Sequence, residues 1–190
     1  MIHLLISKND KILLSVIIPI FNVEKYVYEA FMSIYSQARD NIEIVLMDDG
    51  SEDHSIDQVK DFIDELQVRL FQTENRGLGA ARNLGIEKAQ GEFLYFFDSD
   101  DVLSSNFIAE IKRFIFQDNP DIIAFSGESF LDEGCHTDFF PAYCRNLDAE
   151  DLDGEAAIIQ LSEGKGFFAS ACQYVSRASF WGSEKILFPH

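Results

Sequence analysis

The chain has 190 residues, 47% of them hydrophobic, and a formal net charge of −18 from 33 acidic and 15 basic side chains. This length allows one domain with a substantial core, and the charge excludes a general nucleic-acid surface, which needs a basic face. Three cysteines without a CxxC spacing indicate reduced thiols in a cytoplasmic protein rather than a zinc site. Lys8, Asp10 and Lys11 interrupt the apolar start, so neither a signal peptide nor a transmembrane segment is expected.

Strand and helix patterns alternate along the first two thirds of the chain. Residues 13–21 form a continuous β-branched run, which is typical of a strand buried on both faces. The further predicted elements are a helix over 24–37, a strand over 42–51, a helix over 53–66, a strand over 68–74, a helix over 77–90, a strand over 92–98, a helix over 106–117 and a strand over 121–127. Gly91 is expected to be left-handed just past the third helix, and Ser104 or Ser105 to cap the fourth.

This order of elements predicts an α/β fold with a mostly parallel central sheet flanked by helices on both faces. The periodicity fades from about residue 128, and residues 167–181 resume as a short helical segment. No linker composition marks a second domain. We therefore expect a single domain over residues 1–190.

Polar residues follow the ends of the first four predicted strands. Ligands of open α/β sheets bind beyond the carboxyl ends of the strands, so these residues are expected to converge on one site. They are Asn22 and Glu24 after the first strand, Asp48 to Ser51 after the second, Asn75 to Gly77 after the third, and Asp98, Asp100 and Asp101 after the fourth. A divalent cation would relieve the repulsion among the last three carboxylates and link them to an anionic ligand.

Each segment also has a structural interpretation, because Asp, Asn, Gly and Ser are favoured in turns and helix caps. Phe21 suits a core, and Arg82 suits a solvated helix face. The stretch "FFDSDDVL" fits the hydrophobic-DxDx-(T/V)-L pattern of haloacid-dehalogenase-like phosphatases, but that motif normally ends the first strand of its domain. The stretch "GLGAAR" is half of a dinucleotide fingerprint and has Arg82 where the third glycine belongs. The convergence of four strand ends favours a binding site more than any single motif does.

Three segments together resemble a known family. "VIIPIFNVEKYVYEAFMSIYSQ", "IEIVLMDDGSEDHS" and "NRGLGAARNLGIEKAQGEFLYFFDSDD" are similar, in order and spacing, to the N-terminal half of the inverting glycosyltransferases of family 2. The resemblance covers roughly residues 13–130 and implies the GT-A fold, the Rossmann-like fold of nucleotide-diphospho-sugar transferases. It makes residues 13–127 the nucleotide-sugar-binding half and residues 128–190 the start of the acceptor-side half.

The resemblance implies a metal-dependent transfer of a sugar from a nucleotide-diphosphate donor, expected to be a UDP-sugar, to a glycan or lipid-linked acceptor hydroxyl. Phe21 would lie against the base, where family members usually have Tyr, and Asp49 would accept a hydrogen bond from the base N–H. Glu24 would approach the nucleoside. Asn75 and Arg82 would support the nucleotide or its phosphates. The implied donor-binding set also contains Pro19, Asn22 and Ser99.

The carboxylates after the fourth strand have separate implied roles. Asp98 would hold the ribose side of the donor, and Asp100 would bind Mn²⁺ or Mg²⁺, which prefer oxygen ligands. Such a metal would stabilise the leaving pyrophosphate. Asp101 has no assigned role. The catalytic base stays unknown: the Glu-Asp pair that supplies it in the family is expected beyond His190, so the chain would be a truncated catalytic domain.

Two alternatives stay open beside this transferase. One is a nucleotide-sugar-binding domain without catalysis, and the other is the haloacid-dehalogenase-like phosphatase. The resemblance implies a setting in bacterial surface polysaccharide synthesis, in the cytoplasm at the cytoplasmic face of the membrane. No nucleic-acid partner is expected.

Overall fold

A six-stranded sheet with helices on both faces organises the protein. The computed structural model describes residues 11–39, 41–63, 65, 67–128, 170–183 and 186–189. The strands follow the order β3-β2-β1-β4-β6-β5. They are β1 (Leu14–Ile20), β2 (Ile42–Asp48), β3 (Val68–Gln72), β4 (Phe93–Phe96), β5 (Ile122–Ala124) and β6 (Tyr174–Arg177).

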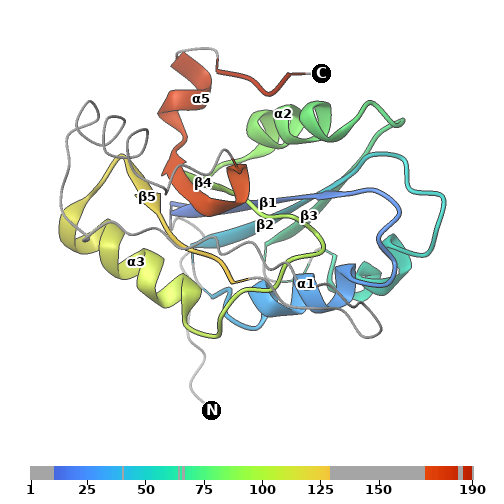
Figure 1. The fold of residues 1–190 in the computed structure, drawn as a ribbon, viewed down its shortest axis with the longest axis horizontal. Helices are drawn as coiled ribbons and strands as arrows, with labels where there is room; N and C mark the ends of the chain where they lie inside the picture. The colour runs from blue at the N-terminus through green and yellow to red at the C-terminus, as the bar shows by residue number, and fades with distance from the viewer. Residues whose placement is uncertain are drawn as a thin grey trace, which may run out of the picture. The chain divides into compact units, whose positions relative to one another are not determined.

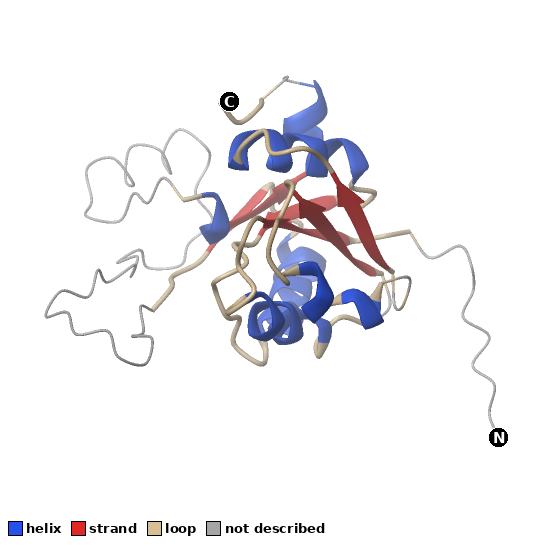
Figure 2. Cartoon of the chain, turned by 90° about the vertical axis from the view of Figure 1, so that its right-hand side faces the viewer, coloured by secondary structure: helices blue, strands red, loops and turns tan. Residues whose placement is uncertain are grey.

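Four α-helices flank this sheet among the described residues. They are α1 (Val27–Tyr35), α2 (Leu78–Lys88), α3 (Phe107–Asp118) and α5 (Ser179–Ser183). Helices α2 and α5 lie on one face of the sheet, and α1 and α3 lie on the other (Figures 1 and 2). The predicted α/β fold with a mostly parallel sheet flanked by helices is therefore confirmed.

The central strands form because most of their side chains, on both faces, are apolar. Every residue of β1 and of β2 is buried, and burial of each large aliphatic side chain stabilises the fold by roughly 1.5–3 kcal/mol. Strand β1 pairs in parallel with β2 and with β4, and β2 pairs in parallel with β3. These four strands consequently end at the same edge of the sheet, where the predicted site residues follow.

The predicted helix over residues 53–66 is wrong. Two 3₁₀ turns, η1 (Ile56–Gln58) and η2 (Lys60–Phe62), occupy this range. Short polar side chains at its start bind nearby backbone and side-chain groups, which competes with α-helical hydrogen bonds. The tight turns bury Val59 and place Phe62 against Phe31 of α1, with the two ring centroids 5.2 Å apart.

Two local predictions further along the chain are also wrong, and a third is right only at its end. Within 167–181, the described residues form a 3₁₀ turn, η3 (Ala171–Gln173), then strand β6, which pairs antiparallel with β4, and only from Ser179 the start of helix α5. Helix α3 begins after Asn106 rather than after Ser104 or Ser105. Gly91 does not have a left-handed φ. A residue without a side chain suits this position because a Cβ there would come within 2.6 Å of the backbone nitrogen of Ser15.

Contacts divide the chain into two compact units, residues 1–123 with 175–190 and residues 124–174. In the second unit, the N–H of Phe125 donates to the carbonyl of Gln173 at 3.2 Å. Residues 129–169 lie outside the described part of the chain. The predicted halves, 13–127 and 128–190, and the single domain over 1–190 therefore stay predictions.

A buried ion pair holds the amino ends of the first three strands together. Glu43, with only 1% of its side chain exposed, accepts hydrogen bonds from Arg69 at 2.8 Å and from the hydroxyl of Ser15 at 2.5 Å. The N–H of Gln90 also donates to this carboxylate. These contacts satisfy a charge that would otherwise be costly to bury, and they lie at the opposite end of the strands from the predicted site.

No helix among the described residues is long and apolar enough to cross a membrane.

Candidate functional site

A pocket of about 290 Å³ lies at the carboxyl ends of the parallel strands. Its wall combines the last residues of β1, residues that follow β1, β2, β3 and β4, and the first turn of α2. The lining residues are Pro19, Ile20, Phe21, Val23, Asp49, Asn75, Gly77, Leu78, Ala81 and Ser99. Residues from four separate segments therefore meet in one cavity, as the parallel sheet requires.

Five members of the predicted donor-binding set line this pocket: Pro19, Phe21, Asp49, Asn75 and Ser99. The other four members, Asn22, Glu24, Arg82 and Asp98, are not among its lining residues, and neither is the predicted metal ligand Asp100. The prediction from sequence missed the apolar part of the wall, namely Ile20, Val23, Leu78 and Ala81. The small and apolar residues that open α2, "GLGAA", were the available signal for two of them.

Two large apolar side chains lie at the pocket with much of their surface in solvent. Phe21 is 44% exposed and Leu78 is 51% exposed. Such side chains offer an aromatic and an aliphatic surface to a flat ring, and aromatic rings favour stacked or edge-on partners. This part of the pocket suits an aromatic ligand group better than a sugar alone.

Asp49 is the buried charge of the pocket, with 4% of its surface exposed. Its Oδ1 accepts the N–H of Arg76 at 2.9 Å and the hydroxyl of Thr73 at 3.3 Å, and its Oδ2 accepts the N–H of Gly77 at 2.7 Å. A carboxylate has about four acceptor positions. Three are used to hold the turn after β3, and the described contacts leave one unused.

Two glycines with positive φ shape these turns, and one of them, Gly50, lies where the turns approach closely. Gly50 has φ +79°, and a Cβ there would come within 2.8 Å of the backbone nitrogen of Asn75. Gly77, with φ +91°, directly precedes α2. Both conformations are readily adopted only by glycine. The two turns therefore meet backbone to backbone, which puts Asn75 beside Asp49.

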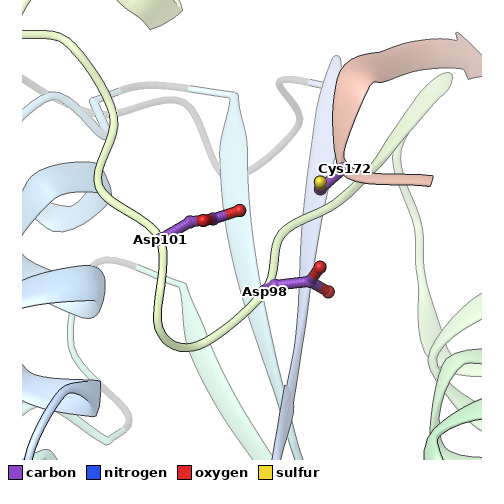
Figure 3. Close-up of side chains that lie close together, drawn as sticks. All are labelled: Asp98, Asp101 and Cys172. Atoms are coloured by element: carbon purple, nitrogen blue, oxygen red, sulfur yellow. The ribbon is translucent and has the colours of Figure 1, made fainter. Parts of the chain in front are cut away.

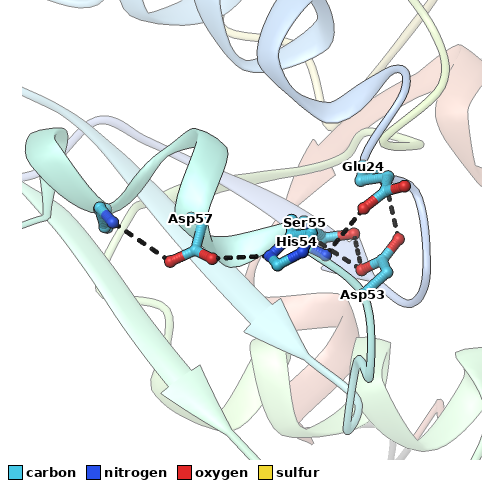
Figure 4. Close-up of polar contacts among 6 residues, drawn as sticks. Glu24, Asp53, His54, Ser55 and Asp57 are labelled. Carbon is cyan, nitrogen blue, oxygen red and sulfur yellow. Dashed lines mark hydrogen bonds and ion pairs between the residues drawn. The ribbon is translucent and has the colours of Figure 1, made fainter.

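The side chains of Asn22 and Glu24 bind the segment 51–55 rather than line the pocket. Asn22 Oδ1 accepts the N–H of Glu52 at 2.9 Å, and its own N–H donates to the hydroxyl of Ser51 at 3.2 Å. Glu24 accepts the N–H of His54 at 2.9 Å, and its own N–H donates to Asp53 at 3.0 Å (Figure 4). These reciprocal contacts fix the turn that carries the pocket residues Phe21 and Val23.

Charged residues in this segment have shifted pKa values. Burial raises the pKa of Asp53, but hydrogen bonds from the Ser55 hydroxyl and from backbone N–H groups lower it more, and the net shift is downward. The hydrogen bond to Asp57, at 3.0 Å, raises the pKa of His54 above its usual 6.5 (Figure 4). Both shifts favour the charged forms that the observed contacts need.

Arg82 and Asp98 pair with each other. The guanidinium Nη2 donates to Asp98 Oδ1 at 2.6 Å, with 12% of the Arg82 side chain and 30% of the Asp98 side chain exposed. Sequence reasoning gave the two residues separate ligand contacts. The pair shows that Arg82 also orients Asp98, on the turn that follows β4.

Hard-cation ligands are available on the turn after β4. Asp100 is exposed, and its carboxylate makes no hydrogen bond or ion pair with the described residues. Carboxylate oxygens of Asp98 and Asp101 lie within 4.8 Å of each other, and Figure 3 shows both side chains on this turn. Cys172, also drawn there, belongs to the second unit. An oxygen-only set of this kind fits Mg²⁺ or Mn²⁺, because Mg²⁺ is often held by one or two carboxylates and substrate phosphates.

Three known proteins show what the chain is similar to. It is 33% identical to EpsH of Bacillus subtilis over 180 residues, which are 92% of the chain and 50% of EpsH. The structure of S. aureus TarS 1-349 in complex with UDP-GlcNAc matches with a TM-score of 0.74 and 26% identity, over 93% of the chain and 48% of TarS. The mannosyltransferase PcManGT from Pyrobaculum calidifontis in complex with GDP-Man and Mn²⁺ matches with a TM-score of 0.53 and 25% identity, over 58% of the chain and 34% of that protein.

The matches span 38–50% of the length of three of the curated relatives. The family model for "Glycosyl transferase family 2" matches residues 15–180. This match covers the sheet, the pocket and the carboxylates after β4. The chain therefore belongs to glycosyl transferase family 2, and its six-stranded α/β structure has the GT-A fold.

Proposed function

We propose that this chain is the donor-binding part of a glycosyltransferase and that the pocket at the strand ends takes the nucleotide of a UDP-sugar. The observation that carries this proposal is the pocket itself, which brings Phe21, Asp49 and Asn75 together from three strand ends. The base lies against Phe21, and its N–H donates to the acceptor position of Asp49 that the turn after β3 leaves open. The UDP-GlcNAc complex of TarS supports this choice of donor.

The phosphate and sugar side of the donor lies toward the turn after β4. Arg82 and Asp98 act there as a pair, with Asp98 holding the ribose side and Arg82 supplying positive charge toward the phosphates. Ser99, which lines the pocket next to this pair, offers a hydroxyl to the donor. The roles of Asn22 and Glu24 in donor binding are indirect, because their side chains hold the turn that carries Phe21.

Asp100 holds a divalent metal in this proposal, with the donor phosphates as its further ligands. Bound Mn²⁺ or Mg²⁺ neutralises the diphosphate and stabilises the leaving group. The exposed carboxylate without a partner among the described residues supports this role, and so does the Mn²⁺ in the complex of PcManGT. A formal net charge of −18 repels an anionic donor, and a bound cation would reduce that repulsion.

The reaction proposed is an inverting transfer to a glycan or lipid-linked hydroxyl in surface polysaccharide synthesis, at the cytoplasmic face of the membrane. Such a transfer needs a general base within hydrogen-bond reach of the acceptor hydroxyl. We assign that base to none of the described residues. Membership in the family favours this transferase over the phosphatase interpretation of "FFDSDDVL".

Calorimetric titration with UDP tests the metal part of the proposal. The unchanged chain is expected to bind UDP at least about tenfold more tightly in Mn²⁺ than in a metal chelator, since the metal offsets charge repulsion. Asp100→Asn removes this gain but keeps the weaker metal-free binding. Asp61→Asn is the control, because it removes another exposed charge, on η2. The metal site would be contradicted if the unchanged chain bound UDP equally well with and without Mn²⁺. It would also be contradicted if Mn²⁺ raised the UDP affinity of Asp100→Asn as much as that of the unchanged chain.

A further inference from the structure

The segment 186–189 is fastened to α2 by one side-chain amide. Asn83 Nδ2 donates to the carbonyl of Phe188 at 3.0 Å, and the N–H of Phe188 donates to Asn83 Oδ1 at 2.8 Å. Asn83 is only 7% exposed, so these two bonds satisfy a buried amide that would otherwise be costly. One turn earlier, Gly79 leaves room for the carbonyl of Pro189, which a Cβ at position 79 would overlap.

This fastening fixes the ring of Phe188 against three other side chains. The ring is T-shaped to Phe96 of β4, with centroids 4.9 Å apart, and stacked on Trp181 of α5 at 5.2 Å and 15°. The guanidinium carbon of Arg82 lies 5.2 Å from the ring centroid. Phe188 therefore contacts an arginine of the candidate site and the strand that leads into the site.

The contact of the Phe188 ring with Arg82 involves a guanidinium group that lacks one hydrogen bond. The Nε of Arg82 is buried and has no hydrogen-bond partner among the described residues. Leaving a charged donor in that state is unfavourable, and the face of an aromatic ring attracts a guanidinium within about 6 Å, more strongly when water is excluded. The attraction between the Phe188 ring and the guanidinium thus offsets part of the cost of leaving the Nε of Arg82 without a hydrogen bond.

Both contacts of Phe188 lead to the same carboxylate. Arg82 donates to Asp98 at 2.6 Å, and Phe96 precedes Asp98 by two residues at the end of β4. A shift of the Phe188 ring changes the surroundings of the arginine and the packing of the strand together. Asp98 is therefore fixed from two sides by one aromatic side chain that lies outside the pocket wall.

We propose that Phe188 and Asn83 are positioning residues for donor binding. Asn83 fixes the main chain of residue 188, the ring of Phe188 fixes the guanidinium of Arg82, and Arg82 presents Asp98 to the donor. This inference rests on the proposed function, in which Asp98 contacts the donor. Phe188 and Asn83 contact no substrate themselves; they set the donor affinity through the arginine-aspartate pair.

Calorimetric titration with UDP in Mn²⁺ tests this proposal on Phe188→Leu, which keeps an apolar side chain but removes the ring. We expect UDP to bind roughly fivefold more weakly, as loss of a cation–π contact to a charged binding group predicts. The matched control is Phe93→Leu. The guanidinium of Arg177 lies 4.8 Å from the Phe93 ring, at the other end of β4. The control removes the same kind of contact from a fully buried position and is expected to leave the affinity for UDP unchanged.

A double-mutant cycle separates positioning from general packing. Phe188→Leu is expected to weaken UDP binding much less in the Arg82→Met background than in the unchanged chain, because the ring acts chiefly through the guanidinium. Asn83→Asp, which loses the donated bond to residue 188, is expected to resemble Phe188→Leu.

The Arg82 side-chain N–H signal in an NMR spectrum supplies a readout that needs no ligand. The chemical shift of this signal should change in the Phe188→Leu variant, because the ring current of Phe188 is lost. It should stay the same in the Phe93→Leu variant. Equal UDP affinities of Phe188→Leu and the unchanged chain, or additive effects of Phe188→Leu and Arg82→Met, would overturn the proposal while leaving the proposed function standing. Absence of UDP binding by the unchanged chain would overturn both.

Discussion

Asp49 is the residue on which the geometry of the pocket depends. It is buried, and it accepts hydrogen bonds from the backbone of Arg76 and of Gly77 and from the hydroxyl of Thr73. These bonds tie the end of β2 to the turn after β3. The same carboxylate is the proposed hydrogen-bond partner of the base. One residue therefore holds the pocket turns together and is also proposed to bind the ligand.

Asp49→Ala is expected to lower the free energy of unfolding by about 3 kcal/mol, because two backbone N–H groups lose a charged acceptor in a buried position. Urea denaturation of the variant and of the unchanged chain measures this. Asp61→Ala, at an exposed position on η2, is expected to change stability by less than about 0.5 kcal/mol. Equal stability of the two variants would show that the Asp49 contacts do not hold the turns together.

His54 should titrate above its usual pKa of 6.5, because Asp57 accepts a hydrogen bond from the imidazolium. A raised pKa in the folded state means that the contact stabilises the fold below pH 6.5 and that this contribution is lost as the pH rises through the folded-state value. An NMR titration of the His54 ring gives its pKa directly. Asp57→Asn is expected to return that pKa toward 6.5; an unchanged value in the variant would contradict the assignment to Asp57.

Helix α2 is the element that connects the pocket with the sheet. Its first turn lines the pocket, and its later residues pack directly on the strands. At Gly85 the helix lies so close to β1 that a Cβ would overlap the side chain of Ile17 and reach within 3.4 Å of Met47. The glycine therefore sets the distance between α2 and the sheet.

Gly85→Ala is expected to destabilise the protein by about 1–3 kcal/mol, because overpacking against β1 forces side chains or the helix to shift. Helix propensity alone favours alanine over glycine by about 1 kcal/mol, so it predicts the opposite sign. Thermal unfolding of the variant decides between the two. A higher melting temperature would show that α2 does not pack on β1 as closely as the structure has it.

Elements with strong periodicity were predictable from sequence, and those that depend on distant partners were not. The β-branched runs of β1 and β2 and the apolar face of α1 need only local patterns. Strand β6 is short and only partly apolar, and it becomes a strand because it pairs with β4, about 80 residues earlier in the chain. Residues 53–66 carry helical spacing, but the contacts of Asp53 and Ser55 with the turn after β1 fix another conformation.

At the scale of the whole molecule, the candidate site was predictable where it follows from the topology of the sheet. Parallel strands end at one edge, so Phe21, Asp49, Asn75 and Ser99 had to converge once the strands were identified. The pairing of Arg82 with Asp98 was not predictable, because it depends on how α2 crosses the sheet. The fastening of residue 188 to Asn83 joins positions 105 residues apart and leaves no local signal in the sequence.

Calorimetric titration of UDP in the presence of Mn²⁺ tests the central claim, that this pocket binds the nucleotide of a sugar donor. We compare the unchanged chain with Phe21→Ala and with Tyr28→Ala, a control that removes a similarly exposed aromatic ring from α1, outside the pocket lining. The unchanged chain and Tyr28→Ala are expected to bind UDP equally, and Phe21→Ala to bind at least about tenfold more weakly, as loss of one base-stacking contact predicts. Failure of the unchanged chain to bind UDP, or equal affinities of Phe21→Ala and the unchanged chain, would contradict the account.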